Sequence, residues 1–177
     1  MLMNFLDPWP HQTIDNFYDG VLFDDMKAEI VNYVKNNVRE KFTKFDWIIE
    51  NYSNDLPKTV ECIKSNLVTE ADLVHFPHHR KYNNLKLKTQ IIVCIDDTEY
   101  RIHDEDKSKI LSAVTYIAPS QATGTLLYDQ NRNFVKEIEW APNRTMIFAG
   151  VENVTWHNYK STKNRIRITL NSFLVED

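Results

Sequence analysis

The first clear hydrophobic pattern in the chain recurs every fourth residue and predicts an amphipathic helix. The apolar positions are Leu22, Met26, Ile30, Val34 and Val38. This spacing places side chains on one face of an α-helix. Acidic residues near its beginning and basic residues near its end suit the helix dipole. The pattern predicts a helix over about residues 20–40 that packs on a core, and a shorter helix near Val60, Ile63 and Leu67.

From residue 85 the hydrophobic period changes to two, the period of a β-strand. Apolar and polar side chains alternate along 85–95, as in a half-buried strand. Further strand-like segments, parted by turn residues, lie at about 99–104, 110–118, 124–128, 134–140, 144–149, 153–159 and 164–174. A short strand is expected at 14–17 and a long polar loop at 69–84. Many short strands with regular turns predict a mainly β protein with N-terminal helices. Its core would be a double-sheet jelly roll, or double-stranded β-helix.

Composition narrows the class of protein. A length of 177 residues favours one domain, with residues 1–84 as N-terminal support and 85–177 as the jelly roll. Two cysteines, Cys62 and Cys94, are too few for a disulfide framework and favour a reducing, cytoplasmic setting. A net charge of −4 with interspersed signs argues against nucleic acid as a partner. No apolar stretch is long enough to span a membrane.

Two histidines and a carboxylate are the candidate catalytic chemistry. His103 and Glu105 stand two positions apart, so both side chains would project to the same side of a strand. His157 would reach the same place from a distant strand. Two imidazoles and one carboxylate, with coordination positions left open, form the facial triad of non-heme Fe(II) oxygenases. Asp104 would face away from this site, whereas Asp106 could replace Glu105 if the strand ended at His103.

An arginine-bearing segment follows His157. The polar run 159–164 is interpreted as a hairpin connection, which places His157 and Arg165 on neighbouring antiparallel strands. Arg165, Arg167 and Thr169 would then share one face. A guanidinium on that face could hold a carboxylate through a forked pair of hydrogen bonds. Alternation alone does not choose between the two arginines.

Six sequence blocks stand in an order that resembles a known family. They are Tyr100–Glu105, Lys109–Ile117, Gly124–Tyr128, Pro142–Phe148, Trp156-His157 and Arg165–Asn171. Together they resemble the catalytic jelly roll of the Fe(II)/2-oxoglutarate-dependent oxygenases, nearest the prolyl 4-hydroxylase-like branch. The resemblance covers roughly residues 85–174. Two positions depart from the branch, which mostly has Asp in place of Glu105 and often has two glycines in place of Gly124-Thr125.

The resemblance implies both an activity and a set of site residues. The expected metal ligands are His103, Glu105 and His157, and the expected 2-oxoglutarate-binding residues are Arg165, Tyr116 and Thr169. Family spacing thus favours Arg165 over Arg167. The implied enzyme is a dioxygenase that uses Fe(II), 2-oxoglutarate and dioxygen, with ascorbate as a further cofactor. It would hydroxylate a C–H bond, first of all in a prolyl or similar group of a peptide, protein or small molecule.

Two other functions compete with this hypothesis. One is a non-catalytic, cupin-like jelly roll that binds a ligand or a protein. The complete set of metal and co-substrate residues argues against it, since a binding module needs none of them. The other is a metal enzyme of a different class, such as a cupin isomerase, which has no need of the Arg165 strand. The histidines His75, His78 and His79 fit no common zinc spacing and are interpreted as part of a solvated loop.

Overall fold

The structure is a computed structural model that describes residues 2–37, 47–49, 56–76, 84–95, 97–161 and 166–176. The helical elements are α1 (Gly20–Asn37), α2 (Pro57–Ser65) and a 3-10 helix (Glu70–His75). The strands are β1 (Leu2–Phe5), β2 (His11–Ile14), β3 (Trp47–Ile49), β4 (Leu85–Ile95), β5 (Lys109–Ala118), β6 (Thr125–Tyr128), β7 (Phe134–Ile138), β8 (Thr145–Ala149), β9 (His157–Tyr159) and β10 (Ile166–Glu176).

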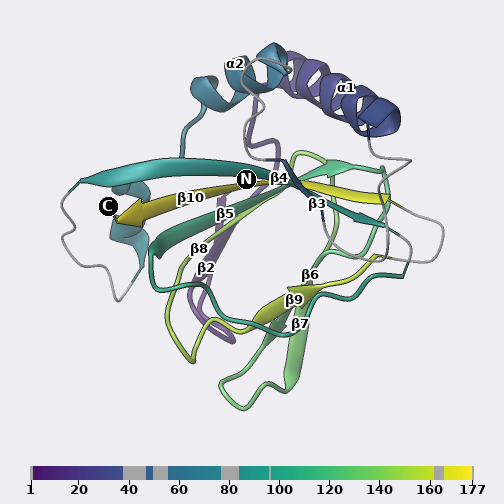
Figure 1. Cartoon of the computed structure of the whole chain (residues 1–177). Coiled ribbons are helices and arrows are strands. Elements are labelled where there is room, and N and C mark those ends of the chain that lie inside the picture. Colours follow the sequence, from purple (N-terminus) through teal and green to yellow (C-terminus); the bar gives the residue numbers. More distant parts are fainter. Residues whose placement is uncertain are drawn as a thin grey trace.

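The strands form two antiparallel sheets that face each other. The large sheet has seven strands in the order β1-β2-β8-β5-β10-β4-β3, and the small sheet has three in the order β7-β6-β9. In Figure 1 the helices α1 and α2 cover one face of the large sheet, and the small sheet lies on its other side. The predicted mainly β jelly roll with N-terminal helices is confirmed. Among the described residues, no helix has the length and apolar character needed to cross a bilayer.

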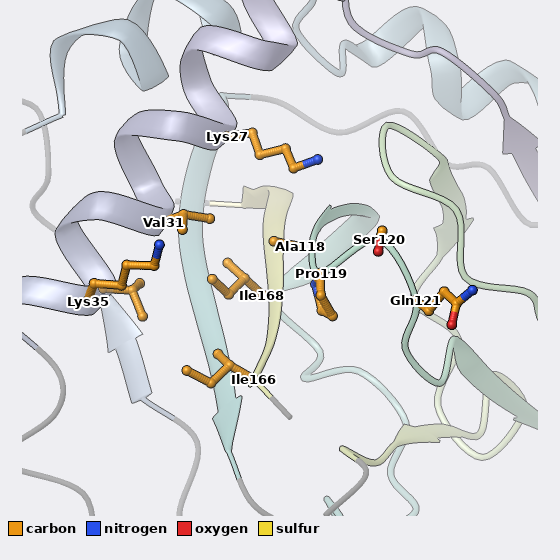
Figure 2. Close-up of a pocket in the computed structure, with 10 residues that line it drawn as sticks. Lys27, Val31, Lys35, Ala118, Pro119, Ser120, Gln121, Ile166 and Ile168 are labelled. Carbon is orange, nitrogen blue, oxygen red and sulfur yellow. The ribbon is translucent and has the colours of Figure 1, made fainter. Parts of the chain in front are cut away.

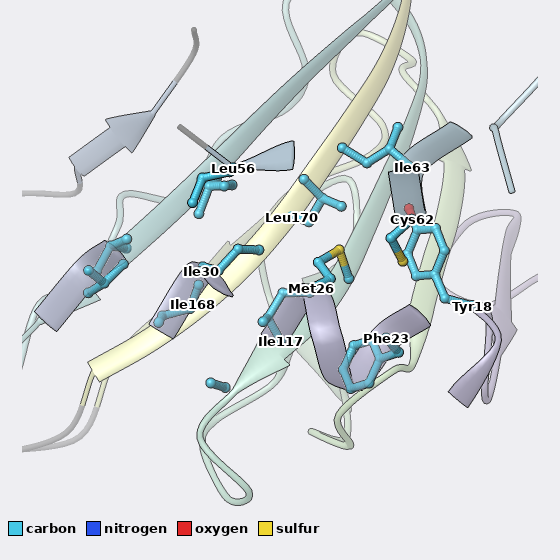
Figure 3. Close-up of a cluster of buried hydrophobic side chains, with 14 residues drawn as sticks. Tyr18, Phe23, Met26, Ile30, Leu56, Cys62, Ile63, Ile117, Ile168 and Leu170 are labelled. Atoms are coloured by element: carbon cyan, nitrogen blue, oxygen red, sulfur yellow. The ribbon is translucent and has the colours of Figure 1, made fainter. Parts of the chain in front are cut away.

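Helix α1 forms where the four-residue period predicts it, and it buries the predicted stripe. Phe23, Met26, Ile30 and Val34 are buried, while Val38 lies outside the described residues. The helix packs against apolar residues of β5 and β10, as Figure 3 shows for Ile117, Ile168 and Leu170. The carboxylate of Asp19 accepts the backbone N–H groups of Val21 and Leu22, which satisfies two donors at the start of the helix.

Helix α2 receives its N-terminal cap from α1 and not from its own sequence. Its N-cap residue is Leu56, which has no side-chain acceptor, and Pro57 follows. The Glu29 carboxylate accepts hydrogen bonds from the N–H of Lys58 at 3.0 Å and from the N–H and hydroxyl of Thr59 at 2.6 and 2.7 Å. One acid therefore joins the two helices that lie on the large sheet.

Several strands differ from their predicted positions. The strand expected at 14–17 lies earlier, at β2, because Asn16 adopts a φ of 53° and turns the chain. Residues 99–104 do not form a continuous strand. Tyr100 and His103 donate hydrogen bonds to the carbonyls of Tyr159 and His157, each at 3.0 Å. The two bonds skip different numbers of residues on the two sides, so the extra residue makes the segment irregular, as in a bulge.

Candidate active site

His103 and His157 are held side by side by the backbone. The N–H of His103 donates to the carbonyl of His157 at 3.0 Å, and the N–H of His157 donates to the carbonyl of His103 at 2.9 Å. This bridge joins the irregular segment before β5 to the first residue of β9. The two imidazole ring centroids are 4.3 Å apart. Two residues far apart in the sequence thus have their rings next to each other.

Both imidazoles are oriented by backbone carbonyls. Nδ1 of His103 lies 3.0 Å from the carbonyl oxygen of Arg101, and Nδ1 of His157 lies 2.8 Å from that of Thr155. Because a carbonyl oxygen can only accept, each Nδ1 carries a proton, and Nε2 is the ring nitrogen at which each histidine would bind a metal. Burial, together with the neighbouring His157, lowers the pKa of His103 to about 4, so this ring is neutral at neutral pH.

Glu105 is the carboxylate that lies against the histidines. It is buried, and its Oε1 lies 3.9 Å from Nε2 of His157. Oε1 also accepts a hydrogen bond from Ser112 at 2.8 Å, and Oε2 pairs with the ammonium of Lys109 at 2.9 Å. Burial by itself would raise the pKa of Glu105, but the attraction of His157 and Lys109 and the hydrogen bonds from Lys109 and Ser112 hold it below its ordinary value. The carboxylate is therefore ionised.

The two competing acids have other partners. Asp104 accepts the N–H of Asn153 at 2.7 Å, and the exposed Asp106 accepts the N–H and hydroxyl of Ser108 at 2.9 and 2.7 Å. Glu105 is the acid that lies against His157, although residues 104–106 do not form a strand. The prediction of Glu105 relied on side-chain alternation along a strand, and that strand does not form in this segment.

His103, Glu105 and His157 lie close together, but their donor atoms do not surround a single metal position. In the described part of the chain, no three His, Cys, Asp or Glu side chains are arranged as a complete set of metal ligands. Glu105 is directed partly toward Lys109 and Ser112. The chemistry of the donors still fits Fe(II), because two imidazoles whose Nδ1 atoms are held by carbonyls, together with one ionised carboxylate, are the ligands that such a metal takes in a facial triad.

A small inner cavity of about 110 Å³ joins these donors to the middle of the large sheet. Its lining includes His103, Glu105, Thr125, His157, Tyr159, Arg167, Thr169 and Asn171. The last three of these come from β10, where alternation places them on one face. The metal-ligand candidates and a cation therefore line one and the same cavity.

Arg167 is the buried cation of this cavity, with only 1 % of its surface exposed. Its guanidinium carbon lies 4.6 Å from the ring centroid of Tyr159, 5.2 Å from that of Trp140 and 5.6 Å from that of Tyr116. Nε donates to the carbonyl of Thr123 at 3.1 Å, while the buried Nη2 has no hydrogen-bond partner among the described residues. A buried donor without an acceptor is costly, and an anionic ligand in the cavity could satisfy it.

The other predicted co-substrate residues have different positions. Thr169 lines the inner cavity, whereas Arg165 lies outside the described residues. The hydroxyl of Tyr116 is 2.9 Å from Oγ1 of Thr125 and accepts the Thr125 N–H at 3.0 Å, while its ring stacks on Trp140 with centroids 4.5 Å apart. Tyr116 therefore stands behind Thr125 and orients it.

Sequence reasoning missed Lys109, Ser112, Thr125 and Asn171 as site residues. Asn171 could have been found, since it continues the alternation of Arg167 and Thr169 along β10. Nothing in the sequence pattern marks Lys109 or Ser112, because their contact with Glu105 depends on how the irregular segment meets β5.

A wider outer chamber of about 580 Å³ opens beyond the histidines. It shares Tyr100, His103, Glu105 and Lys109 with the inner cavity, so the two spaces meet at the metal-ligand candidates. Another hollow, of about 600 Å³, lies between α1 and the ends of β5 and β10 (Figure 2). That hollow is lined by Lys27, Lys35 and mostly apolar side chains, and it has no histidine or acid for chemistry.

Comparisons with known proteins agree on one fold. Neither the protein-family models nor the curated proteins match the chain. Among solved structures, a prolyl hydroxylase from Trichoplax adhaerens, in complex with a hypoxia inducible factor peptide fragment, superposes with a TM-score of 0.67 at 12% identity. That match covers 94% of this chain and 83% of the other chain.

Two further structures give the same result. The viral collagen prolyl hydroxylase of Paramecium Bursaria Chlorella virus-1, a 2OG complex, has a TM-score of 0.62 at 13% identity and covers 94% of this chain and 96% of its own. A Pseudomonas putida prolyl-4-hydroxylase has a TM-score of 0.56 at 12% identity and covers 94% and 92%. At such low identity the likeness establishes the fold, and this chain therefore has the jelly-roll fold of the prolyl hydroxylases.

Proposed function

We propose that this protein is an Fe(II)- and 2-oxoglutarate-dependent dioxygenase that hydroxylates a C–H bond. One observation carries the proposal. His103, His157 and Glu105 line the same small cavity as the buried side chain of Arg167. A metal-binding set and a carboxylate-binding cation in one enclosed space are what a 2-oxo acid needs to bind through both of its ends.

In this proposal the two histidines and Glu105 hold the iron. Nδ1 of each ring is fixed by a carbonyl, which directs Nε2 to the metal and maintains the tautomer. Ser112 orients the Glu105 carboxylate from β5. When bound, iron and 2-oxoglutarate together supply the activation of dioxygen, and the protein positions and shields the reacting groups.

Arg167 holds the distal carboxylate of 2-oxoglutarate. Its Nη2, which has no partner among the described residues, is the donor for that carboxylate, while Nε is held by the carbonyl of Thr123, and Thr169 lines the same cavity. The surrounding rings keep water out, which strengthens a guanidinium–carboxylate pair. The proposal assigns to Arg167 the role that family spacing gave to Arg165. Tyr116 and Thr125 would orient the co-substrate from the small-sheet side.

The solved structures with the same fold suggest a first substrate class to test. They are prolyl hydroxylases, and one of them is a complex with a peptide fragment. A prolyl or similar group in a peptide, protein or small molecule is therefore the first substrate to test. Dioxygen is the second co-substrate, and ascorbate would restore iron that becomes oxidised.

The test is anaerobic addition of Fe(II) with and without 2-oxoglutarate, followed by visible absorbance. The expected result is a weak charge-transfer band that requires both components. Glu105→Ala should abolish the band, and the matched control Asp106→Ala should keep it, because Asp106 is exposed and bonded to Ser108. A wild-type protein that forms no band would contradict the proposal.

The competing function, a metal-free binding module, rests on the contact between Lys109 and Glu105. An ammonium 2.9 Å from the carboxylate already neutralises the charge that a metal would otherwise balance. The absorbance test decides between these functions. A binding module would give no band, and Lys109→Gln would not restore one.

A further inference from the structure

The outer chamber has a distribution of charge that bears on the substrate. Its charged lining residues are Arg101, Asp104, Glu105, Asp106, Lys109 and Arg132. Every acid in this set already has donors from the protein. Glu105 pairs with Lys109, Asp104 accepts a backbone N–H, and Asp106 accepts two hydrogen bonds from Ser108. Asp104 and Asp106 keep their negative charge, but their acceptor oxygens are engaged, and Lys109 is paired with Glu105; the two guanidinium groups are the cations of the lining without an ion pair among the described residues.

Arg132 is placed in the chamber by its own turn. It follows β6 at a φ of 63°, a conformation that non-glycine residues seldom adopt. Asp129 fixes the turn, because its carbonyl accepts the Arg132 N–H at 2.9 Å and its carboxylate accepts the N–H groups of Asn131 and Asn133 at 2.8 Å. The guanidinium then lies 3.9 Å from the ring centroid of Trp156, a cation–π distance. Its edge N–H groups stay available to a ligand.

Arg101 enters the chamber beside the metal-ligand candidates. Its carbonyl fixes Nδ1 of His103, which ties its position to that ring. Its side chain is exposed and has no hydrogen bond or ion pair within the described part of the chain. The chamber thus holds two guanidinium groups that form no salt bridge within the described part of the chain, beside the metal-ligand candidates His103 and Glu105.

We propose, on the basis of the oxygenase function above, that the substrate carries a carboxylate and that Arg101 and Arg132 bind it in the outer chamber. A forked guanidinium is well matched to a carboxylate. The chamber volume of about 580 Å³ is in the range of ordinary ligand pockets. The anchored carboxylate would leave the remainder of the substrate directed at His103 and His157. Arg101 and Arg132 thereby select substrates and do not take part in the chemistry.

The carboxylate can come from two sources, a free acid or an acidic side chain of a peptide. Two matched pairs of probes separate them. The first pair is N-acetyl-L-proline and the neutral N-acetyl-L-prolinamide. The second pair is the end-blocked tripeptides Ala-Pro-Asp and Ala-Pro-Asn. Binding is measured by calorimetry on protein loaded with Mn(II) and 2-oxoglutarate without dioxygen, and again on unloaded protein.

The expected result is tighter binding of the carboxylate member in at least one pair. The pair that responds names the source. Arg101→Gln and Arg132→Gln should each raise the Kd of that probe about tenfold, the loss expected for one charge-assisted hydrogen bond. Lys107→Gln is the matched control, since Lys107 also carries a positive charge but pairs with Glu152 at 3.1 Å and does not line the chamber.

Two results would overturn the inference. One is equal binding, or no binding, of the charged and neutral members of both pairs to protein that loads normally. The other is a carboxylate Kd that both arginine variants leave unchanged. Failure to load Mn(II) and 2-oxoglutarate would instead count against the oxygenase function. The titrations of unloaded protein then decide whether the two arginines form an anion site.

Discussion

The most informative single change is Arg167→Met, because it separates co-substrate binding from folding. Methionine keeps an unbranched side chain among the three rings but removes the guanidinium. The variant loses the hydrogen bond to Thr123 and the cation–π contacts, and it also removes a buried charge with an unsatisfied Nη2. These effects oppose each other, so the unfolding free energy without ligand should change by less than about 2 kcal/mol.

The effect on 2-oxoglutarate should be much larger. Loss of a buried guanidinium–carboxylate pair costs about 2–4 kcal/mol, roughly 30- to 1000-fold in affinity. At a ligand concentration of about 100 times Kd, the wild type gains roughly 2.7 kcal/mol of stability. For a chain of this length that corresponds to a rise in Tm of about 5–11 °C. A variant that binds about 100-fold more weakly would gain roughly 0.4 kcal/mol, or about 1–2 °C.

The assay is thermal unfolding of Mn(II)-loaded protein with and without 2-oxoglutarate under nitrogen. The shift is compared within each variant, so any change in basal stability cancels. Arg165→Met is the matched control and should retain the wild-type shift. A full shift in Arg167→Met, or a loss confined to Arg165→Met, would refute the assignment and give the role to Arg165.

Three further predictions concern other parts of the chain. Glu105→Ala should weaken Mn(II) binding by more than about 100-fold and Glu105→Asp by roughly tenfold, measured by anaerobic titration; normal binding by the alanine variant would exclude Glu105 as a ligand. Burial lowers the pKa of His11 from 6.5 to about 4, so this imidazole stays neutral in the folded state at a pH where it is protonated in the unfolded state. The stability that neutral His11 contributes is therefore present above pH 6.5 and is lost as the pH falls from 6.5 toward 4. Urea unfolding at pH 7 and pH 5 should show a loss from this group of about 2 kcal/mol that His11→Phe removes; equal pH slopes would be inconsistent with this. Glu29→Ala should lower the unfolding free energy by about 1–3 kcal/mol because helix α2 loses its cap. The control Glu61→Ala breaks only an exposed pair with Lys58 and should cost less than about 1 kcal/mol. Equal losses for the two variants in urea unfolding would show that Glu29 is not a cap.

The fold could largely be predicted because period and burial agree along most of the chain. The stripe ending at Val34 formed α1, and the alternation from Leu85 formed β4. The predictions failed where tertiary contacts decide the structure. β1 and β3 carry short apolar runs without turn signals, and each is a strand because a neighbour pairs with it. The segment before β5 is irregular because it contains an extra residue, as in a bulge, and an alternating hydrophobic pattern does not predict where a bulge occurs.

The metal-ligand candidates could be predicted from residue type and order, whereas their surroundings could not. His103 and His157 meet because of one backbone bridge between distant segments, and hydrophobic periodicity does not predict such a bridge. Alternation left the choice between Arg165 and Arg167 open because it predicts both on one face, and family spacing favoured Arg165. Burial of Arg167 among aromatic rings is what the structure adds. Likewise, the ion pair between Lys109 and Glu105 depends on how the irregular segment packs beside β5, which the sequence pattern does not predict.

The position of β10 in the large sheet has a consequence for how the protein is made. β10 pairs with β4 on one side and with β5 on the other, so the strand nearest the C-terminus lies inside the sheet and not at its edge. During synthesis β4 and β5 must wait for β10 before they can be joined, with their unpaired edges exposed to aggregation. The long sequence separation of these pairs also favours slow folding. Because Arg167 lies on β10, the residue proposed to hold 2-oxoglutarate arrives with the strand that completes the sheet.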